Sequence, residues 1–183
     1  MSRLKFLLEA LKNFREVGTI TRSGHALTNK IASFVLETDI HVLELGAGDG
    51  AITRKILKNM HPSGKLLSFE INPNMYKQLL SIDDPRLIAI NCSAEELEKH
   101  MKIHNISMFD SIVSAIPYIV LPKALALKIL NLCKTYLKEN KPYLQVHYAK
   151  SPSHLYKGVF GNLKTYWVLK NIPPAYVFKC IKK

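Results

Sequence analysis

The sequence predicts an α/β fold, in which a doubly wound and mainly parallel sheet of seven strands ends in a C-terminal antiparallel hairpin. Short apolar runs alternate with segments of helical periodicity over residues 1–149, as they do in successive βαβ units. A glycine-rich stretch, LELGAGDGAIT, includes the end of the first strand-like run. Such turns connect a strand to a helix at the edge of a parallel sheet where ligands bind. The predicted order of elements is therefore Rossmann-like.

Seven runs with strand character supply this sheet. They cover residues 40–45, 65–71, 86–91, 109–115, 142–149, 163–170 and 175–181. The last two flank an Asn-Ile-Pro-Pro turn at residues 171–174. A connection this short cannot make a parallel crossover, so at least one of these two strands is expected to run antiparallel.

Five segments have the spacing of apolar side chains that is typical of helices. They are residues 2–15, 24–36, 53–59, 94–101 and 122–139, the last with Pro122 at its start. A chain of 183 residues has the length of one domain with a sizeable core. We therefore expect a single domain over residues 1–183, with helices on both faces of the sheet.

Composition limits the classes of function. Hydrophobic residues make up 48% of the chain and charged residues 22%, which is typical of a globular protein. No apolar run approaches the ~18 residues of a membrane span, and Met1 is not followed by a signal-peptide core, so a cytoplasmic location is expected. The three cysteines, Cys92, Cys133 and Cys180, lie far apart and the histidines are scattered. No metal site is predicted.

Basic residues outnumber acidic residues by 26 to 14, which gives a net charge of +12. An excess of this size indicates an anionic partner, either an acidic membrane surface or nucleic acid. A general compositional bias toward lysine would account for part of it.

Three glycines on alternate positions, Gly46, Gly48 and Gly50, indicate a turn that needs positive φ or lies against a ligand. Glu70 follows Gly50 by 20 residues (70 − 50) and stands at the end of the second predicted strand. A carboxylate in that place can accept both hydroxyls of a ribose. The glycine spacing is unlike that of a dinucleotide fingerprint. A tight turn beside a surface glutamate is the alternative interpretation.

With Glu44 ahead of it, the turn resembles the first motif of class I S-adenosylmethionine-dependent methyltransferases, an acidic residue followed after one position by Gly-x-Gly-x-Gly. The resemblance implies that Glu44 contacts the methionine part of the cofactor, directly or through water. It also implies that Glu70 binds the ribose and that Ile71 packs against the adenine ring.

At the end of the third strand this family commonly carries an acid and an alanine, which bind the adenine amine, whereas this chain has Ser93 and Ala94. At the end of the fourth strand, Ser114 is expected beside the sulfonium methyl. The implied cofactor-binding residues are Glu44, Gly46, Ala47, Gly48, Gly50, Glu70, Ile71, Ser93, Ala94 and Ser114.

The fourth strand also bears on the methyl acceptor. Ribosomal RNA adenine dimethyltransferases carry Asn-x-Pro-Tyr here, and the asparagine accepts a hydrogen bond from the base amine. This chain has Ala115-Ile116-Pro117-Tyr118, and alanine cannot accept that bond. The Ser-Ala-Ile-Pro sequence instead resembles bacterial phospholipid N-methyltransferases, which methylate phosphatidylethanolamine. The stretches LKNFREVGTITRSGHALTNKIA and WVLKNIPPAYVFK resemble the same group, so the similarity spans nearly the whole chain.

The amino-terminal segment, residues 1–17, is predicted to form a basic amphipathic helix. Its apolar stripe consists of Leu4, Leu7, Leu8, Leu11 and Phe14, with Lys5, Lys12 and Arg15 beside it. Such a helix suits an anionic bilayer surface. Packing of the stripe on the domain itself is the alternative.

Methyl transfer to an amine requires the neutral amine, and His147 at the end of the fifth predicted strand is the candidate to receive its proton. Tyr118 and Tyr148 are candidates to face the methylated cation, because aromatic rings attract quaternary ammonium groups. Each of the three has an alternative role in packing.

The sequence thus predicts an S-adenosylmethionine-dependent N-methyltransferase that acts on phosphatidylethanolamine at the inner membrane surface. An RNA (adenine-type) or protein methyltransferase is the alternative that the charge favours. An inactive cofactor-binding module is the alternative that Ser93 suggests.

Overall fold

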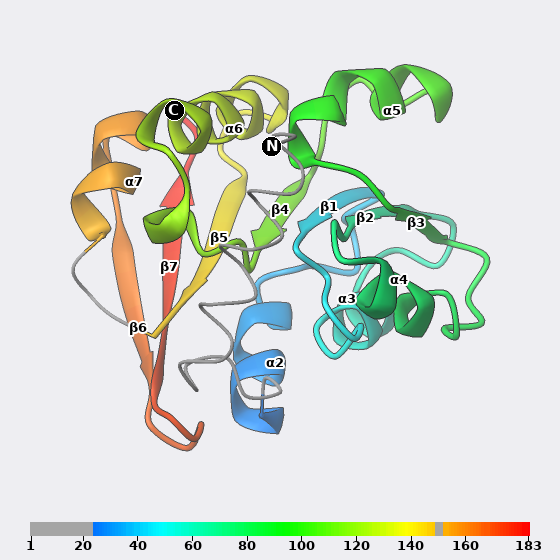
Figure 1. The fold of residues 1–183 in the computed structure, drawn as a ribbon, viewed down its shortest axis with the longest axis horizontal. Helices are drawn as coiled ribbons and strands as arrows, with labels where there is room; N and C mark the ends of the chain where they lie inside the picture. Colours follow the sequence, from blue (N-terminus) through cyan, green and yellow to red (C-terminus); the bar gives the residue numbers. More distant parts are fainter. Residues whose placement is uncertain (1–23, 149–151) are drawn as a thin grey trace.

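The computed structural model describes residues 24–148 and 152–183, and its centre is a seven-stranded sheet (Figure 1). Five parallel strands are β1 (His41–Leu45), β2 (Lys65–Phe69), β3 (Leu87–Ile90), β4 (Ser111–Ser114) and β5 (Pro142–His147). The closing strands β6 (Lys164–Val168) and β7 (Ala175–Ile181) form an antiparallel hairpin, and β7 pairs with β5. The order β3-β2-β1-β4-β5-β7-β6 confirms the predicted mixed sheet.

Helices cover both faces of the sheet. The α-helices are α2 (His25–Ala32), α3 (Thr53–Asn59), α4 (Pro73–Leu79), α5 (Leu97–Ile103), α6 (Lys123–Tyr136) and α7 (Ser153–Phe160), with 3₁₀ turns η1 (Ala94–Glu96) and η2 (Tyr118–Val120). One core cluster joins α2 and α3 to the sheet, and the other joins α5, α6 and α7 to its opposite face. Strands buried on both faces are apolar along most of their length, which explains the continuous apolar runs in the sequence.

The register of the parallel strands aligns their carboxyl ends. Leu45 lies opposite Phe69 of β2 and opposite Ser114 of β4, and Phe69 lies opposite Ile90 of β3. Four strands therefore end in one row, and the segments that follow them emerge at the same edge. The strand order reverses between β1 and β4, which is where ligands bind in sheets of this kind.

Two helices in the structure were not predicted. The α4 helix has start signals, since the Asn72 side chain accepts hydrogen bonds from the backbone N–H groups of Asn74 and Met75 and Pro73 occupies the first turn. The α7 helix ends at Gly161, whose φ is +74°. With seven and eight residues, these helices are too short to give a clear apolar period.

Several predicted elements extend too far, including the helix predicted over 24–36, which ends at Ala32. The helix predicted over 122–139 ends at Tyr136, because Leu137 is extended and forms a parallel bridge with Phe109. The strands predicted over 109–115 and 142–149 are β4 and β5, which are shorter. The predicted helix at residues 2–15 lies outside the described residues.

Candidate cofactor and acceptor site

The turn after β1 has three glycines in the left-handed region of the backbone, with φ of +77° at Gly46, +61° at Gly48 and +80° at Gly50. The backbone N–H groups of Gly46 and Ala47 both donate to the carbonyl oxygen of Phe69, at 2.8 and 3.0 Å. The turn is thereby attached to the end of β2. Positive φ at all three positions gives the physical reason for the glycines.

The three glycines differ in what surrounds them. A Cβ atom at Gly46 would lie 3.3 Å from the backbone nitrogen of Ile116, and one at Gly50 would lie 2.6 Å from the Ile82 side chain. A Cβ at Gly48 would meet no atom within 4 Å. Gly46 and Gly50 are thus required by close protein neighbours, whereas Gly48 faces open space that a ligand can occupy.

The Glu70 carboxylate connects this turn to the segment after β2. Its Oε2 accepts from the N–H of Gly48 and its Oε1 from the N–H of Asn72, both at 2.8 Å. Glu70 is 5% exposed. A carboxylate has about four acceptor positions, so two remain for the hydroxyl groups of a ribose.

Glu44 lies buried beside the turn, and its Oε2 accepts hydrogen bonds from the hydroxyls of Thr53 and Ser68, each at 2.7 Å. Its Oε1 is buried and, in the described part of the chain, has no hydrogen-bond partner. Burial raises the pKa of Glu44 to about 7. An unpaired buried carboxylate oxygen is costly and suits a cationic or water partner. Sequence analysis missed Thr53 and Ser68 as the residues that position Glu44.

The adenine side of the predicted site is less polar than in the family. Ser93 caps η1, where its hydroxyl accepts from the N–H of Glu95 at 3.3 Å. Glu95 forms an ion pair with Lys128 at 3.1 Å. Ala94 is buried, and Ile71 is half-buried against the core cluster of α5, α6 and α7. The adenine contact predicted for Ser93 stays a prediction.

The end of β4 borders the glycine turn directly. The N–H of Ala115 donates to the carbonyl of Leu45 at 2.8 Å, and Ile116 is the neighbour that excludes a side chain at Gly46. Ser114 is fully buried, and its hydroxyl accepts from the N–H of Ile116 at 3.3 Å. Donor turn and predicted acceptor stretch therefore meet at the reversal point of the sheet.

Gln145 is a residue that sequence analysis missed. It lies opposite Ser114 in the register, is fully buried, and donates to the carbonyl of Ile116 at 2.9 Å. The hydroxyl of Tyr143 donates to its Oε1 at 2.7 Å. Gln145 thus fixes the backbone after β4. The sequence signal for Gln145 is a single amide side chain within an otherwise apolar strand.

The three predicted catalytic residues are not brought together. Tyr118, 2% exposed, packs edge-on against Tyr156, and the His147 imidazole forms a hydrogen bond with the Tyr156 hydroxyl at 2.5 Å. Tyr148 is half-buried against the core cluster of the opposite face. Burial lowers the pKa of His147 to about 4 and raises that of Tyr118. Their catalytic roles stay predictions, and a packing role for Tyr118 and His147 agrees with their burial.

The fold also gathers a group that the spacing of the cysteines did not indicate. Ligand atoms of Cys92, Glu96 and His100 lie within 4.8 Å of one another, and the Cys92 sulfur is 3.5 Å from Nε2 of His100. Burial raises the pKa of the Cys92 thiol to about 11. At neutral pH this group is therefore a protonated thiol beside an imidazole.

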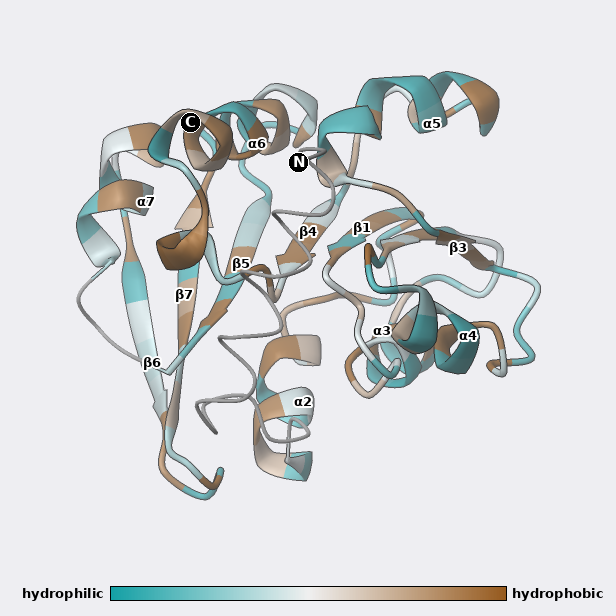
Figure 2. Ribbon diagram, in the orientation of Figure 1, coloured by the Kyte–Doolittle hydropathy of each residue, from teal (hydrophilic) through white to brown (hydrophobic). Residues whose placement is uncertain are grey.

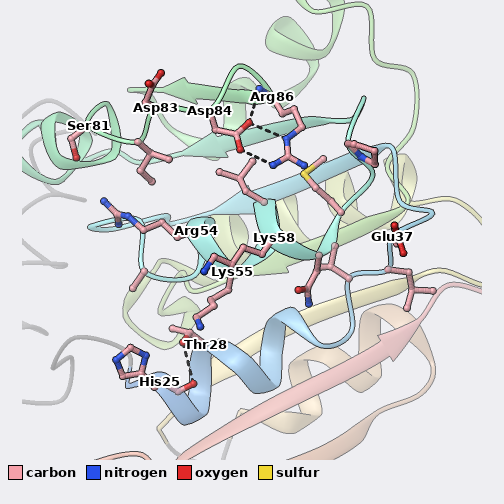
Figure 3. Close-up of a pocket in the computed structure, with 18 residues that line it drawn as sticks. His25, Thr28, Glu37, Arg54, Lys55, Lys58, Ser81, Asp83, Asp84 and Arg86 are labelled. Carbon is pink, nitrogen blue, oxygen red and sulfur yellow. Dashed lines mark hydrogen bonds and ion pairs between the residues drawn. The ribbon is translucent and has the colours of Figure 1, made fainter.

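A groove of about 1240 Å³ runs along α3 (Figure 3). Figure 3 shows His25 and Thr28 of α2 on one side of it and Asp83, Asp84 and Arg86 on the other. Arg54, Lys55 and Lys58 of α3 lie between them. None of the predicted site residues lines this groove, but it adjoins the end of the glycine turn, because Ala51, Arg54 and Ile82 line it and Ile82 and Arg54 lie beside Gly50.

Comparison with known proteins places this geometry among methyltransferases. No family model matches the chain. The ornithine lipid N-methyltransferase of Singulisphaera acidiphila is 24% identical over 144 residues, covering 76% of this chain and 74% of that protein. Precorrin-6y C5,15-methyltransferase from Geobacter metallireducens has a TM-score of 0.67 and 12% identity, covering 86% of this chain and 88% of its own. Aeropyrum pernix fibrillarin, in complex with natively bound S-adenosyl-L-methionine, has a TM-score of 0.61 and 21% identity, covering 80% and 68%.

The chain has the fold of the class I methyltransferases. In sequence it resembles a lipid N-methyltransferase, and S-adenosylmethionine is its expected cofactor. The described residues fit this cofactor. Gly48 leaves room for it, Glu44 offers an unpaired oxygen to its cationic methionine part, and Glu70 retains acceptor positions for its ribose.

Replacing Gly48 with alanine is expected to weaken S-adenosylmethionine binding at least about tenfold, because the new methyl group enters the open space above the turn. Gly161→Ala is the matched control, since Gly161 also has positive φ and an open Cβ direction. Both variants carry the same backbone strain of roughly 1–2 kcal/mol. Calorimetric titration with S-adenosylmethionine measures the difference, and equal affinities in the two variants would place the cofactor elsewhere.

Cofactor affinity is expected to rise about eightfold from pH 6 to pH 7.5, because Glu44 has a pKa of about 7 when free and must ionise to face a cation. Protonation below that pKa opposes binding, so the loss occurs on the acid side. Binding should release protons, which titrations in buffers of different ionisation enthalpy detect. Glu44→Gln should remove the pH dependence, and a dependence that survives in this variant would exclude Glu44 as its source.

Glu70→Ala is expected to reduce the binding free energy of S-adenosylmethionine by about 1.5–3 kcal/mol, the contribution of a hydrogen bond to a charged group. Asp84→Ala is the control, because Asp84 also accepts from a backbone N–H, that of Arg86 at 3.0 Å, outside the site. Both variants should lower the melting temperature, but only the first should lower affinity. Tighter binding of a nicotinamide dinucleotide than of S-adenosylmethionine by the unaltered protein would contradict the cofactor assignment.

Proposed function

We propose that the protein is an S-adenosylmethionine-dependent N-methyltransferase that methylates the primary amine of a membrane lipid headgroup, with phosphatidylethanolamine as the first candidate. The observation that carries this proposal is the contact between the end of β4 and the glycine turn at Gly46, with Ala115 in the acceptor stretch. Alanine offers no side-chain acceptor for the planar amine of a base. An alkyl amine needs only its lone pair aligned with the methyl group. The lipid N-methyltransferase relative supports the same class of acceptor.

The chemistry requires positioning more than acid–base groups. Bound S-adenosylmethionine would supply a methyl group that is open to in-line displacement by the amine nitrogen. The glycine turn and Glu70 would hold the donor, and the backbone after β4, fixed by Gln145, would border the acceptor. Alignment of this kind contributes much of the acceleration in two-substrate reactions.

The amine must be neutral when it reacts, and a primary alkyl ammonium has a pKa near ~10, like lysine. His147 is a weak base with a pKa of about 4, and Tyr156 and Phe178 pack against its ring. We therefore propose that the amine loses its proton before it enters the site.

In the described part of the chain, no helix has both the length and the apolar character that crossing a membrane requires. We propose that the protein reaches lipid from the membrane surface, with residues 1–17 as a basic amphipathic anchor. The groove with Arg54, Lys55 and Lys58 favours RNA as the alternative partner.

Purified protein with methyl-labelled S-adenosylmethionine is expected to label vesicles that contain phosphatidylethanolamine. Parallel samples contain ornithine lipid, an amine-free lipid or total RNA, and Gly48→Ala serves as the cofactor-deficient control. With neutral amine as the reacting form, the rate at saturating cofactor should rise about tenfold per pH unit between pH 6 and 9. A flat profile would mean that a group of low pKa takes the proton.

The samples separate the candidate acceptors. Label in ornithine lipid but not in phosphatidylethanolamine would support a lipid acceptor with a headgroup other than ethanolamine. Label in RNA alone, or no label in any lipid from protein that binds cofactor normally, would contradict the lipid proposal.

A further inference from the structure

The β6–β7 hairpin extends past the end of the strands that form the site. His147, the last residue of β5, lies opposite Tyr176, the second residue of β7. The connection at residues 169–174 therefore projects beyond the carboxyl end of β5 (Figure 1). Because β1, β4 and β5 are parallel, the glycine turn leaves β1 on the same side of the sheet. Whatever covers this tip also lies at the edge where the methyl acceptor must arrive.

Large apolar side chains at this tip are exposed. Trp167 is 61% exposed, Leu169 62% and Ile172 86%. The indole ring of Trp167 stacks on Tyr176, with centroids 5.9 Å apart and 8° between the planes. Figure 2 shows hydrophobic and hydrophilic residues interleaved here. Single exposed apolar residues are common, but three large ones near the end of one hairpin, two of them on its connection, indicate a contact surface.

The tip is held in place by Asn171, which is 1% exposed. Its Oδ1 accepts from the backbone N–H of Gly24 at the start of α2, at 2.9 Å, and its Nδ2 donates to the carbonyl of Pro173 at 2.7 Å. Leu169 and Ile172 lie on either side of this buried anchor. Their exposure thus belongs to a turn that is fixed on the rest of the fold.

The carboxyl-terminal segment of the chain carries charge of one sign. Residues 140–183 contain eight lysines and no Asp or Glu, so all 14 acidic residues of the chain precede this segment. Lys170 is exposed on the connection itself, whereas Lys164 begins β6 opposite Lys179, at the other end of the hairpin. Anionic lipid headgroups complement such a surface, and tryptophan and lysine are both favoured at the boundary between headgroups and acyl chains.

We propose that the β6–β7 hairpin docks on an anionic lipid bilayer, with Trp167, Leu169 and Ile172 entering the interface and Lys170 contacting headgroups. The inference rests on the proposed function, because a lipid acceptor has to arrive at this edge. It adds a second membrane contact, built from described residues, to the one proposed for residues 1–17.

Trp167 is the only tryptophan in the chain, so intrinsic fluorescence reports on this hairpin without a label. Vesicles of phosphatidylglycerol and phosphatidylcholine, which contain no primary amine, should shift its emission to the blue and protect it from acrylamide. Brominated lipids should quench it, and high salt should reverse the effect, because salt screens the lysines. No methyl transfer is needed for this measurement.

Leu169→Ser with Ile172→Ser keeps the tryptophan and should lower vesicle affinity about tenfold or more, because two inserting side chains are lost. Ile103→Ser is the matched control, because Ile103 is an exposed apolar residue of α5, with an exposed fraction of 57%. The neighbouring residue His104 accepts a hydrogen bond from Lys65 at the start of β2, so Ile103 lies at the opposite edge of the sheet. The control should bind vesicles normally, and both variants should bind S-adenosylmethionine with unchanged affinity.

Two results would overturn the proposal. Protein that sediments with vesicles while its tryptophan emission stays constant uses another surface. A blue shift that grows with protein concentration without vesicles means that a second copy covers the tip. The proposed function is tested separately. Insertion of Trp167 without lipid methylation would contradict the proposed function alone. Equal methylation of bilayer lipid by the unaltered protein and the double variant would contradict the hairpin proposal alone.

Discussion

The carboxylate of Glu70 is the interaction on which the rest of the site depends. It binds a backbone N–H from the turn after β1 and another from the segment after β2. Without it, two backbone donors in a half-buried turn would lose their partners, which costs free energy for each unsatisfied group. A residue identified from sequence as a ligand contact therefore also builds the turn that the ligand meets. The hydrogen bonds that shape the turn are thus made within the chain itself.

Alternation and glycine spacing were enough to predict the sheet, the antiparallel hairpin and the edge at which the glycine turn lies. Those features follow from the alternation of strand-like and helix-like segments, which recurs along the chain. The α4 and α7 helices were missed because short helices are specified by caps at Asn72 and Gly161 rather than by a period. Packing partners such as Tyr156 were missed because their neighbours come from distant segments.

The predicted site residues also fall into two groups, those that a sequence motif specifies and those whose surroundings depend on packing. Gly46, Gly48 and Gly50 have the positive φ that their spacing indicated, and Glu70 accepts a hydrogen bond from the turn that they form. Tyr118 and His147 were chosen for their chemistry and their place at strand ends, and the fold buries both against Tyr156. The burial of these two residues depends on Tyr156 of α7, a helix that was not predicted from the sequence. The glycine turn and Glu70 thus lie together as the motif implies, whereas the surroundings of Tyr118 and His147 depend on tertiary contacts.

The hydrogen bond between Asn171 and Gly24 has a consequence for orientation. Gly24 is the first residue of the described part of the chain, so this part begins beside the hairpin tip. A protein attached to a surface at one point can swivel about it. If the proposed contacts of the hairpin and of residues 1–17 both form, two attachments limit that rotation and keep the hairpin tip turned toward the surface. A lipid headgroup would then have to rise only a short way out of its leaflet, and its acyl chains would remain in the bilayer throughout.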